Sequence, residues 1–393
     1  MRVGFRWLLD AAVLALPFAG MAPATLGCGT DADDVVNSPL PIGGSGGAVG
    51  GSGGAAGAAG QPQGGGTVGG GQPDGGTLGL TRPFDDTSPY NTEIPANPVL
   101  DPNSSRATMV NAARPTMALY LWTPRIYEVD GDTEQRILVS CTEAWGTCEL
   151  EDSTQNQAGG VPIPAGALGA PEADGHMVVW DRKNEISYDF WRYRYPNNTA
   201  PEGQTSWGGL VSTAGNGVDT PGGRFGAGGA TGADIARLAG IIRVAEVQSG
   251  VIPHALVGPT TNSCSTFRWP ALKSDGWSTR SDCLPEGARM QLDPSIDLDT
   301  VTGLRPIDRM VAEALQTYGW FNIDNGGSFN GSETGWAVQF ESDLTATGTS
   351  CPAVGQTYCA AGAAAEYDAL RGTLPDSTPL FSHMRVLNTW NGQ

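Results

Sequence analysis

The chain has 393 residues, 57 of them glycine, and a formal net charge of −19 at pH 7. A chain this acidic repels phosphate backbones and anionic lipid surfaces, so its composition argues against a nucleic-acid partner. The length allows one large folded domain or two small ones.

The first 27 residues have the pattern of an export signal. Arg2 and Arg6 give a positive start, and the apolar run over 11–20 is too short to span a bilayer. Residues 25–28 (Thr-Leu-Gly-Cys) resemble the lipobox of bacterial lipoproteins, which implies a lipid anchor on Cys28. The alternative is an ordinary secretory signal cut a few residues earlier.

Residues 28–80 read as a flexible tether. From residue 42 onward they are mostly Gly, Ala, Ser and Gln, which cannot bury enough apolar surface to fold. We expect one globular domain over 81–393, held at the outer membrane or cell surface by the lipid alone. The domain is expected to be a monomer.

The cysteine count agrees with export. Seven cysteines are present, and the six that remain without Cys28 allow 15 connectivities. Their order favours three local disulfides: Cys141 with Cys148, Cys264 with Cys283, and Cys351 with Cys359. Disulfides imply an oxidising compartment. Zinc binding is the alternative, but CxxC spacing and a nearby His are missing, so no metal is expected.

Dense turn residues and short apolar runs over 81–393 favour a mainly β fold. We expect a jelly-roll-like antiparallel β-sandwich with two or three attached helices. The runs 176–180 and 185–195 flank the polar turn 181–184 and predict a β-hairpin. Alternation places the following residues on its core face: Met177, Val179, Ile186, Tyr188 and Phe190.

The opposite face of this hairpin carries the most suggestive chemistry. If Asp181 pairs with Asn184, then His176 lies opposite Asp189, with Cβ atoms about 5 Å apart. A carboxylate beside an imidazole raises its basicity, as a general base requires. Trp191 and Tyr193 would follow on the same face and suit sugar rings. The alternative is a structural cross-strand pair.

Other polar residues add candidates further along the chain. His254 opens an apolar run and lies either at the mouth of a cleft or buried in a strand. The segment between Cys264 and Cys283 could form one wall of a cleft or a surface loop closed by a disulfide. The further candidates along the chain are catalytic His254 and Asp275, and substrate-binding Arg192, Trp207, Trp269, Lys273 and Asp324.

Helices are expected at 234–247, 306–318 and 361–371. The second is the clearest, because its apolar residues follow 3,4-spacing and Pro306 and Gly319 suit its two ends. Strands are expected at 320–324 and 384–387. The alternating Asp293, Asp297 and Asp299 could bind calcium, but a solvated acidic loop is the default and no cofactor is expected.

Four segments resemble a group of uncharacterised secreted bacterial β-sandwich proteins. They are 88–95 (Ser-Pro-Tyr-Asn-Thr-Glu-Ile-Pro), 174–181, 253–256 and 314–326. The resemblance spans most of 81–393 and implies no particular activity. The tethered N-terminus resembles those of myxobacterial surface lipoproteins.

Three functions remain open. The first is a polysaccharide-active enzyme: in a hydrolase, Asp189 with Asp275 or Asp324 would be acid and base. In a lyase, His176 or Tyr193 would abstract a proton while Arg192, Arg194 or Arg268 neutralised a uronate. The second is a non-catalytic glycan-binding or adhesion module of the envelope, and the third a structural envelope protein. The expected partner is a polysaccharide or another large extracellular ligand.

Overall fold

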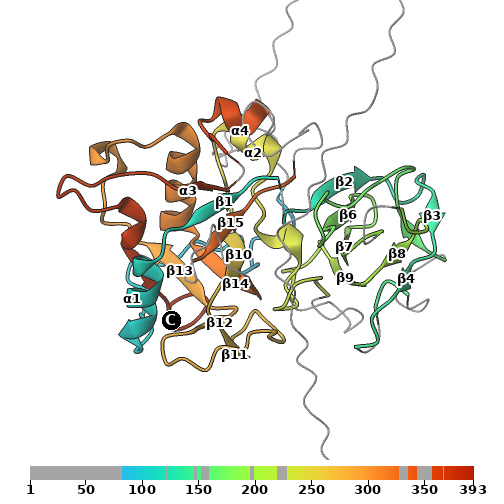
Figure 1. Cartoon of the computed structure of the whole chain (residues 1–393), viewed down its shortest axis with the longest axis horizontal. Helices are drawn as coiled ribbons and strands as arrows, with labels where there is room; N and C mark the ends of the chain where they lie inside the picture. Colours follow the sequence, from blue (N-terminus) through green and yellow to red (C-terminus); the bar gives the residue numbers. More distant parts are fainter. Residues whose placement is uncertain are drawn as a thin grey trace, which may run out of the picture. The chain divides into compact units, whose positions relative to one another are not determined.

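The computed structural model describes residues 82–393, except 121, 146–147, 152–158, 195–198, 219–227, 327–334, 343–355 and 366 (Figure 1). The predicted signal, Cys28 and the tether therefore lie outside the described residues. Within the described part, 28% of residues are in strands and 15% in helices, which confirms a mainly β fold. None of the helices in this part is long and apolar enough to cross a bilayer.

Three larger sheets carry most of the strands (Figure 1). The first, in the order β2-β6-β7-β9, consists of Arg125–Val129, Met177–Asp181, Ile186–Trp191 and Trp207–Ser212. The second, β10-β14-β13-β17, consists of Leu256–Thr260, Trp320–Asn325, Arg289–Leu292 and Met384–Val386. The third, β15-β1-β16, consists of Ala337–Gln339, Thr116–Ala118 and Tyr367–Ala369.

Short elements complete the described part. The two-stranded sheets are β11-β12 (Ser263–Phe267 and Leu284–Glu286), β3-β5 (Arg136–Ile137 and Val161–Pro162) and β4-β8 (Ser140–Cys141 and Gln204–Thr205). The α-helices are α1 (Ser104–Ala112), α2 (Val244–Ser249), α3 (Pro306–Thr317) and α4 (Gln356–Ala360). The 3₁₀ turns are η1 (Arg237–Ala239), η2 (Leu298–Thr300) and η3 (Leu380–Ser382).

The prediction of purely antiparallel sheets is wrong. Each of the three larger sheets contains one parallel pair: β2 with β6, β10 with β14, and β1 with β15. Parallel neighbours need long crossover connections, which a local sequence pattern does not reveal. The jelly-roll arrangement stays a prediction.

The sheet β2-β6-β7-β9 is buried on both faces. The predicted core face of β6 and β7 is confirmed, because Met177, Tyr188 and Phe190 pack in one apolar cluster. The other face, expected to be open, is also covered: Val178 and Trp180 pack against a second cluster that includes residues from 233–241. Because the sheet is covered on both faces, every residue of β6 is buried.

The hairpin register differs from the prediction. Asp181 pairs with Ile186, so four residues rather than two form the turn, and Val178 lies opposite Asp189. The Asp181 carboxylate holds this turn: it accepts hydrogen bonds from the backbone N–H groups of Gly131, Lys183 and Asn184. The predicted direct pairing of His176 with Asp189 is therefore wrong.

Replacing Asp181 should test this turn. Asp181 is fully buried, and Asp181→Ala leaves three backbone N–H groups without their acceptor. We expect a loss of about 3 kcal/mol of unfolding free energy, measured by urea denaturation. Asp181→Asn keeps Oδ1, which accepts all three of these bonds, and loses only the bond from Asn184 Nδ2 to Oδ2, so it should lose about 1 kcal/mol. An Ala variant as stable as the wild type would contradict this role.

The helix predictions had mixed outcomes. The predicted helix 306–318 is confirmed as α3, which packs on β13 (Figure 1). Gly319 follows it with φ 72°, and its N–H donates to Ala314 O. The predicted helix 234–247 is instead split into η1 and α2 around Gly240, where an added Cβ would lie 2.5 Å from Ala255 O.

Near the C-terminus, the predicted helix 361–371 is wrong, because β16 occupies most of its second half. The strands predicted at 320–324 and 384–387 are confirmed as β14 and β17. Two of the three predicted disulfides are present, Cys141–Cys148 and Cys264–Cys283. The third involves Cys351, which lies outside the described residues.

Candidate functional site

Acidic side chains from separate segments meet around one buried arginine. We call Asp174, Asp275, Glu286 and Asp324, together with Arg237, the carboxyl cluster. Main-chain hydrogen bonds bring these segments together: Ala233 N–H donates to Ile323 O in β14, and Leu272 N–H donates to Ala233 O. The 230–237 segment is thereby fixed between the end of β14 and the disulfide-closed loop that carries Asp275.

Arg237 lies at the centre of the cluster with only 1% of its surface exposed. Its Nη2 lies 3.6 Å from Asp324 Oδ2 and donates to Ala230 O. Its Nε and Nη1 have no hydrogen-bond partner among the described residues. Buried donors without a partner are uncommon in native structures.

Asp189 positions Arg237 rather than facing an open surface. It is fully buried, and its carboxylate accepts hydrogen bonds from Arg237 N–H at 2.6 Å and from Ser187 Oγ. Burial raises the pKa of Asp189 to about 6, although the bond from the Arg237 backbone opposes this shift. We therefore assign Asp189 a positioning role.

Asp324 has the properties of a proton donor near neutral pH. Its side chain is 24% exposed at the end of β14. Burial and the neighbouring Asp275 carboxylate raise its pKa to about 7, while Arg237 acts in the opposite direction. A carboxylic acid that holds its proton near neutrality is what general acid catalysis requires.

Glu286 and Asp275 are neighbouring carboxyl groups. Glu286 is fully buried at the end of β12, and burial together with Asp275 raises its pKa to about 9. Glu286 is therefore protonated at neutral pH and can donate to the exposed Asp275 carboxylate. Gly232 makes room for this pair, because a Cβ there would lie 2.3 Å from Asp275 Oδ1.

Asp174 joins the cluster to an aromatic surface. It is 29% exposed, accepts a hydrogen bond from Trp191 Nε1 at 3.1 Å, and lies 3.7 Å from His176 Nε2. Burial, and secondly Arg237, lower the pKa of His176, which keeps its imidazole neutral. Burial and Asp174 raise the pKa of Glu172 to about 8.

Trp191 belongs to a group of three tryptophans. Its ring stacks on that of Trp145 with centroids 5.5 Å apart, and Trp145 also contacts Trp207. Trp145 is largely exposed, and Arg192 lies over the Trp191 ring. Exposed aromatic faces beside polar groups suit the CH-rich faces of sugars.

Comparisons with known protein families, curated proteins and solved structures gave no match. The site must therefore be interpreted from its own chemistry. Two large cavities described in the structure are lined by other residues and lie along α3.

Several predicted site residues lie outside the carboxyl cluster. His254 is buried, and its two ring nitrogens contact Glu246 Oε1 and Ala255 O at 2.9 and 2.8 Å. Both partners are acceptors, so both nitrogens donate, and Glu246 raises the pKa of His254 against the effect of burial. The buried alternative is therefore the correct one for His254.

Tyr193 does not share a face with Trp191. Arg192 has φ 57°, which turns the chain after β7, so Tyr193 is fully buried against Phe190. Trp269, inside the disulfide-closed loop, packs on Trp390. Lys273 is half-exposed, 3.8 Å from Asp234.

The aspartates considered for calcium have other partners. Asp293 and Asp297 accept backbone hydrogen bonds from Ser295 and Asp299, and Asp299 pairs with Arg309. No group of three metal-ligating side chains occurs in the part of the chain that the structure describes.

The sequence predicted His176, Asp189 and Asp324, which the structure places against Arg237, and Trp191 and Asp275, which lie next to Asp174 and Asp324. It missed Asp174, Glu286 and Arg237 itself. The sequence does indicate two of these residues, because Arg237 and Glu286 are charged residues inside short apolar runs. Charged residues are rarely buried unless they are paired, so such positions indicate a buried polar site.

Proposed function

We propose that the protein is an exported, lipid-anchored glycoside hydrolase whose carboxyl cluster cleaves a polysaccharide. The observation that carries this proposal is Asp324, a partly exposed carboxyl group with a pKa near 7 beside a second, exposed carboxylate. Glycosidases use one protonated and one ionised carboxyl group. The two disulfides are compatible with export.

Each group in the cluster has a role in this reaction. Asp324 protonates the leaving glycosidic oxygen, and Asp275 acts on the opposite side as base or nucleophile. Glu286, which is protonated at neutral pH, would supply a hydrogen-bond donor next to Asp275. The exposed ring of Trp145, which stacks on Trp191 beside Asp174, supplies an aromatic surface for a sugar ring.

The alternative lyase mechanism receives less support. A lyase needs a cation that is free to neutralise a uronate carboxylate. Arg268 is bound to Asp101 and to Leu387 O, and Arg194 pairs with Glu202. With several carboxylates and one buried arginine, the cluster favours a neutral or basic glycan over an acidic one.

A polysaccharide panel tests the proposal. Full-length protein is incubated with neutral, amino-sugar-containing and uronate-containing glycans. New reducing ends without ultraviolet absorbance of unsaturated uronates are the expected result. Unsaturated products would instead indicate a lyase. Retained binding without any product would indicate a glycan-binding module, and either outcome would overturn the hydrolase proposal.

A further inference from the structure

Two exposed tryptophan rings from separate segments lie near the carboxyl cluster. Trp145 is 64% exposed and Trp277 is 72% exposed. Each lies in a loop that one of the two described disulfides closes, Cys141–Cys148 for the first and Cys264–Cys283 for the second. A loop that is already constrained loses less freedom when it binds a ligand, so both rings are preorganised for contact with a partner.

The segment that carries Trp277 is fixed against β11 on both sides of the exposed ring. Ser274 Oγ and Ser278 N–H donate to backbone carbonyls of β11 at 2.8 and 3.0 Å. Exposure alternates along the segment: Asp275 and Trp277 are exposed, and the residues that alternate with them are half-buried. Residues two apart in an extended segment point to the same side, about 7 Å apart along it. A sugar bound on Trp277 therefore lies next to the Asp275 carboxylate.

Trp145 is connected to the cluster through Trp191. Its ring stacks on that of Trp191 at 5.5 Å, and Trp191 Nε1 donates to Asp174. Burial raises the pKa of Asp324, and the carboxylates of Asp275 and Asp174 add to this effect, so both lie near Asp324. Each exposed ring is thus close to a carboxylate that neighbours the proposed acid.

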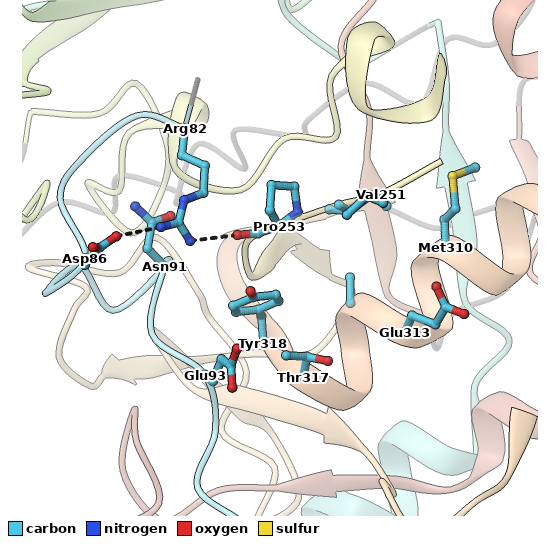
Figure 2. Close-up of a pocket in the computed structure, with 12 residues that line it drawn as sticks. Arg82, Asp86, Asn91, Glu93, Val251, Pro253, Met310, Glu313, Thr317 and Tyr318 are labelled. Carbon is cyan, nitrogen blue, oxygen red and sulfur yellow. Dashed lines mark hydrogen bonds and ion pairs between the residues drawn. The ribbon is translucent and has the colours of Figure 1, made fainter. Parts of the chain in front are cut away.

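The cavity along α3 includes neither ring. Figure 2 shows Tyr318, at the end of α3, facing the segment that carries Val251 and Pro253, and neither tryptophan is among the lining residues. Small molecules are bound in concave sites of this kind. Rings on an open surface leave room for a chain that continues beyond the site in both directions.

We propose that one glycan chain spans both rings, with sugar units bound at Trp145 and at Trp277 and the cleaved bond at Asp324. Each ring would contact the CH-rich face of a sugar unit. The proposal rests on the glycoside hydrolase function for its ligand and adds the substrate class. A chain held on both sides of the cleaved bond is cut internally, so the substrate is a polymer and not the terminal unit of a chain.

Calorimetric titration with oligosaccharides of increasing length tests the proposal. The probes are cellulose- and chitosan-derived series from disaccharide to octasaccharide, added to full-length Asp324→Asn so that they stay intact. Affinity for at least one series should rise with length, because a longer chain engages both rings at once. Equal affinity for disaccharide and octasaccharide, or no binding by either series, would overturn the proposal.

Variants in the same background locate the bound chain. Trp145→Ala and Trp277→Ala should each weaken octasaccharide binding about tenfold, the usual effect of removing a tryptophan contact. The matched control is Val251→Ala, which truncates an exposed apolar side chain in the cavity along α3 and should bind as its parent does. A loss in Val251→Ala with none in Trp277→Ala would place the glycan in that cavity and contradict the proposal.

Product sizes separate this proposal from the hydrolase function. Wild-type protein with chitosan or hydroxyethylcellulose should release fragments of mixed length from the start of the reaction, measured by mass spectrometry. Release of only monosaccharides and disaccharides would keep the hydrolase function and overturn cleavage inside the chain. No release, with length-dependent binding that both tryptophan variants lose, would overturn the hydrolase function and support binding across the two rings.

Discussion

Asp324→Asn should reduce glycan hydrolysis by roughly 10²- to 10⁴-fold, the usual contribution of a general acid. The amide has the shape of the carboxyl group but cannot transfer a proton to the leaving oxygen. Glycan binding should remain close to that of the wild type, because the aromatic surface at Trp191 is unchanged. The two quantities are measured as reducing-end release and by affinity electrophoresis on the same polysaccharide.

The pH dependence of the wild-type enzyme gives a second readout of Asp324. The acid must be protonated, and its pKa of about 7 means that activity should fall as the pH rises above 7. The matched control is Asp376→Asn, which removes an exposed carboxylate from a surface turn and should keep both rate and pH profile. Full activity in Asp324→Asn would show that another group donates the proton.

Glu286→Gln should make the protein more stable at high pH. The folded-state pKa of Glu286 is raised to about 9 from an ordinary value of 4.5, so the folded state binds this proton more tightly. The protonated Glu286 carboxyl group therefore stabilises the folded state fully below pH 4.5, and this stabilisation is lost as the pH rises through 9. The loss is about 1.4 kcal/mol per pH unit where the two states differ by one proton.

Glutamine keeps the shape and a hydrogen-bond donor but does not ionise. We expect Glu286→Gln to match the wild type near pH 5 and to exceed its unfolding free energy by about 5 kcal/mol near pH 9. Urea denaturation at several pH values measures the difference. Glu134→Gln, a surface change, should follow the wild-type curve. Parallel curves for the wild type and Glu286→Gln would mean that Glu286 does not hold a proton in the folded state.

Local sequence patterns predicted the helices and strands whose buried faces follow from residue spacing within the helix or strand itself. The apolar stripe of α3 and the strand β14 that follows it depend on spacing and on Gly319, and both are confirmed. The core face of β6 and β7 was also predictable. The hairpin register was not, because the turn depends on the hydrogen bond from Gly131 N–H to Asp181, which joins residues 50 positions apart.

The membership of the carboxyl cluster could be predicted only in part. Asp275 and Asp324 were found as separate polar residues in a stapled loop and at a strand end. Their meeting depends on Arg237 and on the contact of Ala233 with Ile323, which joins segments about 90 residues apart. No local pattern encodes such a contact, and the helix expected at 234–247 pointed to a different structure for that segment.

The proposed hydrolysis depends on a proton held by Asp324 near neutral pH, and this proton can be measured directly. Carbon-13 NMR of protein labelled at the aspartate side-chain carboxyl carbons, with Asp324→Asn to assign the signal, gives its titration curve. We expect a midpoint near pH 7. A midpoint near 3.8, the ordinary value for aspartate, would leave Asp324 ionised at neutral pH and would contradict its role as the acid.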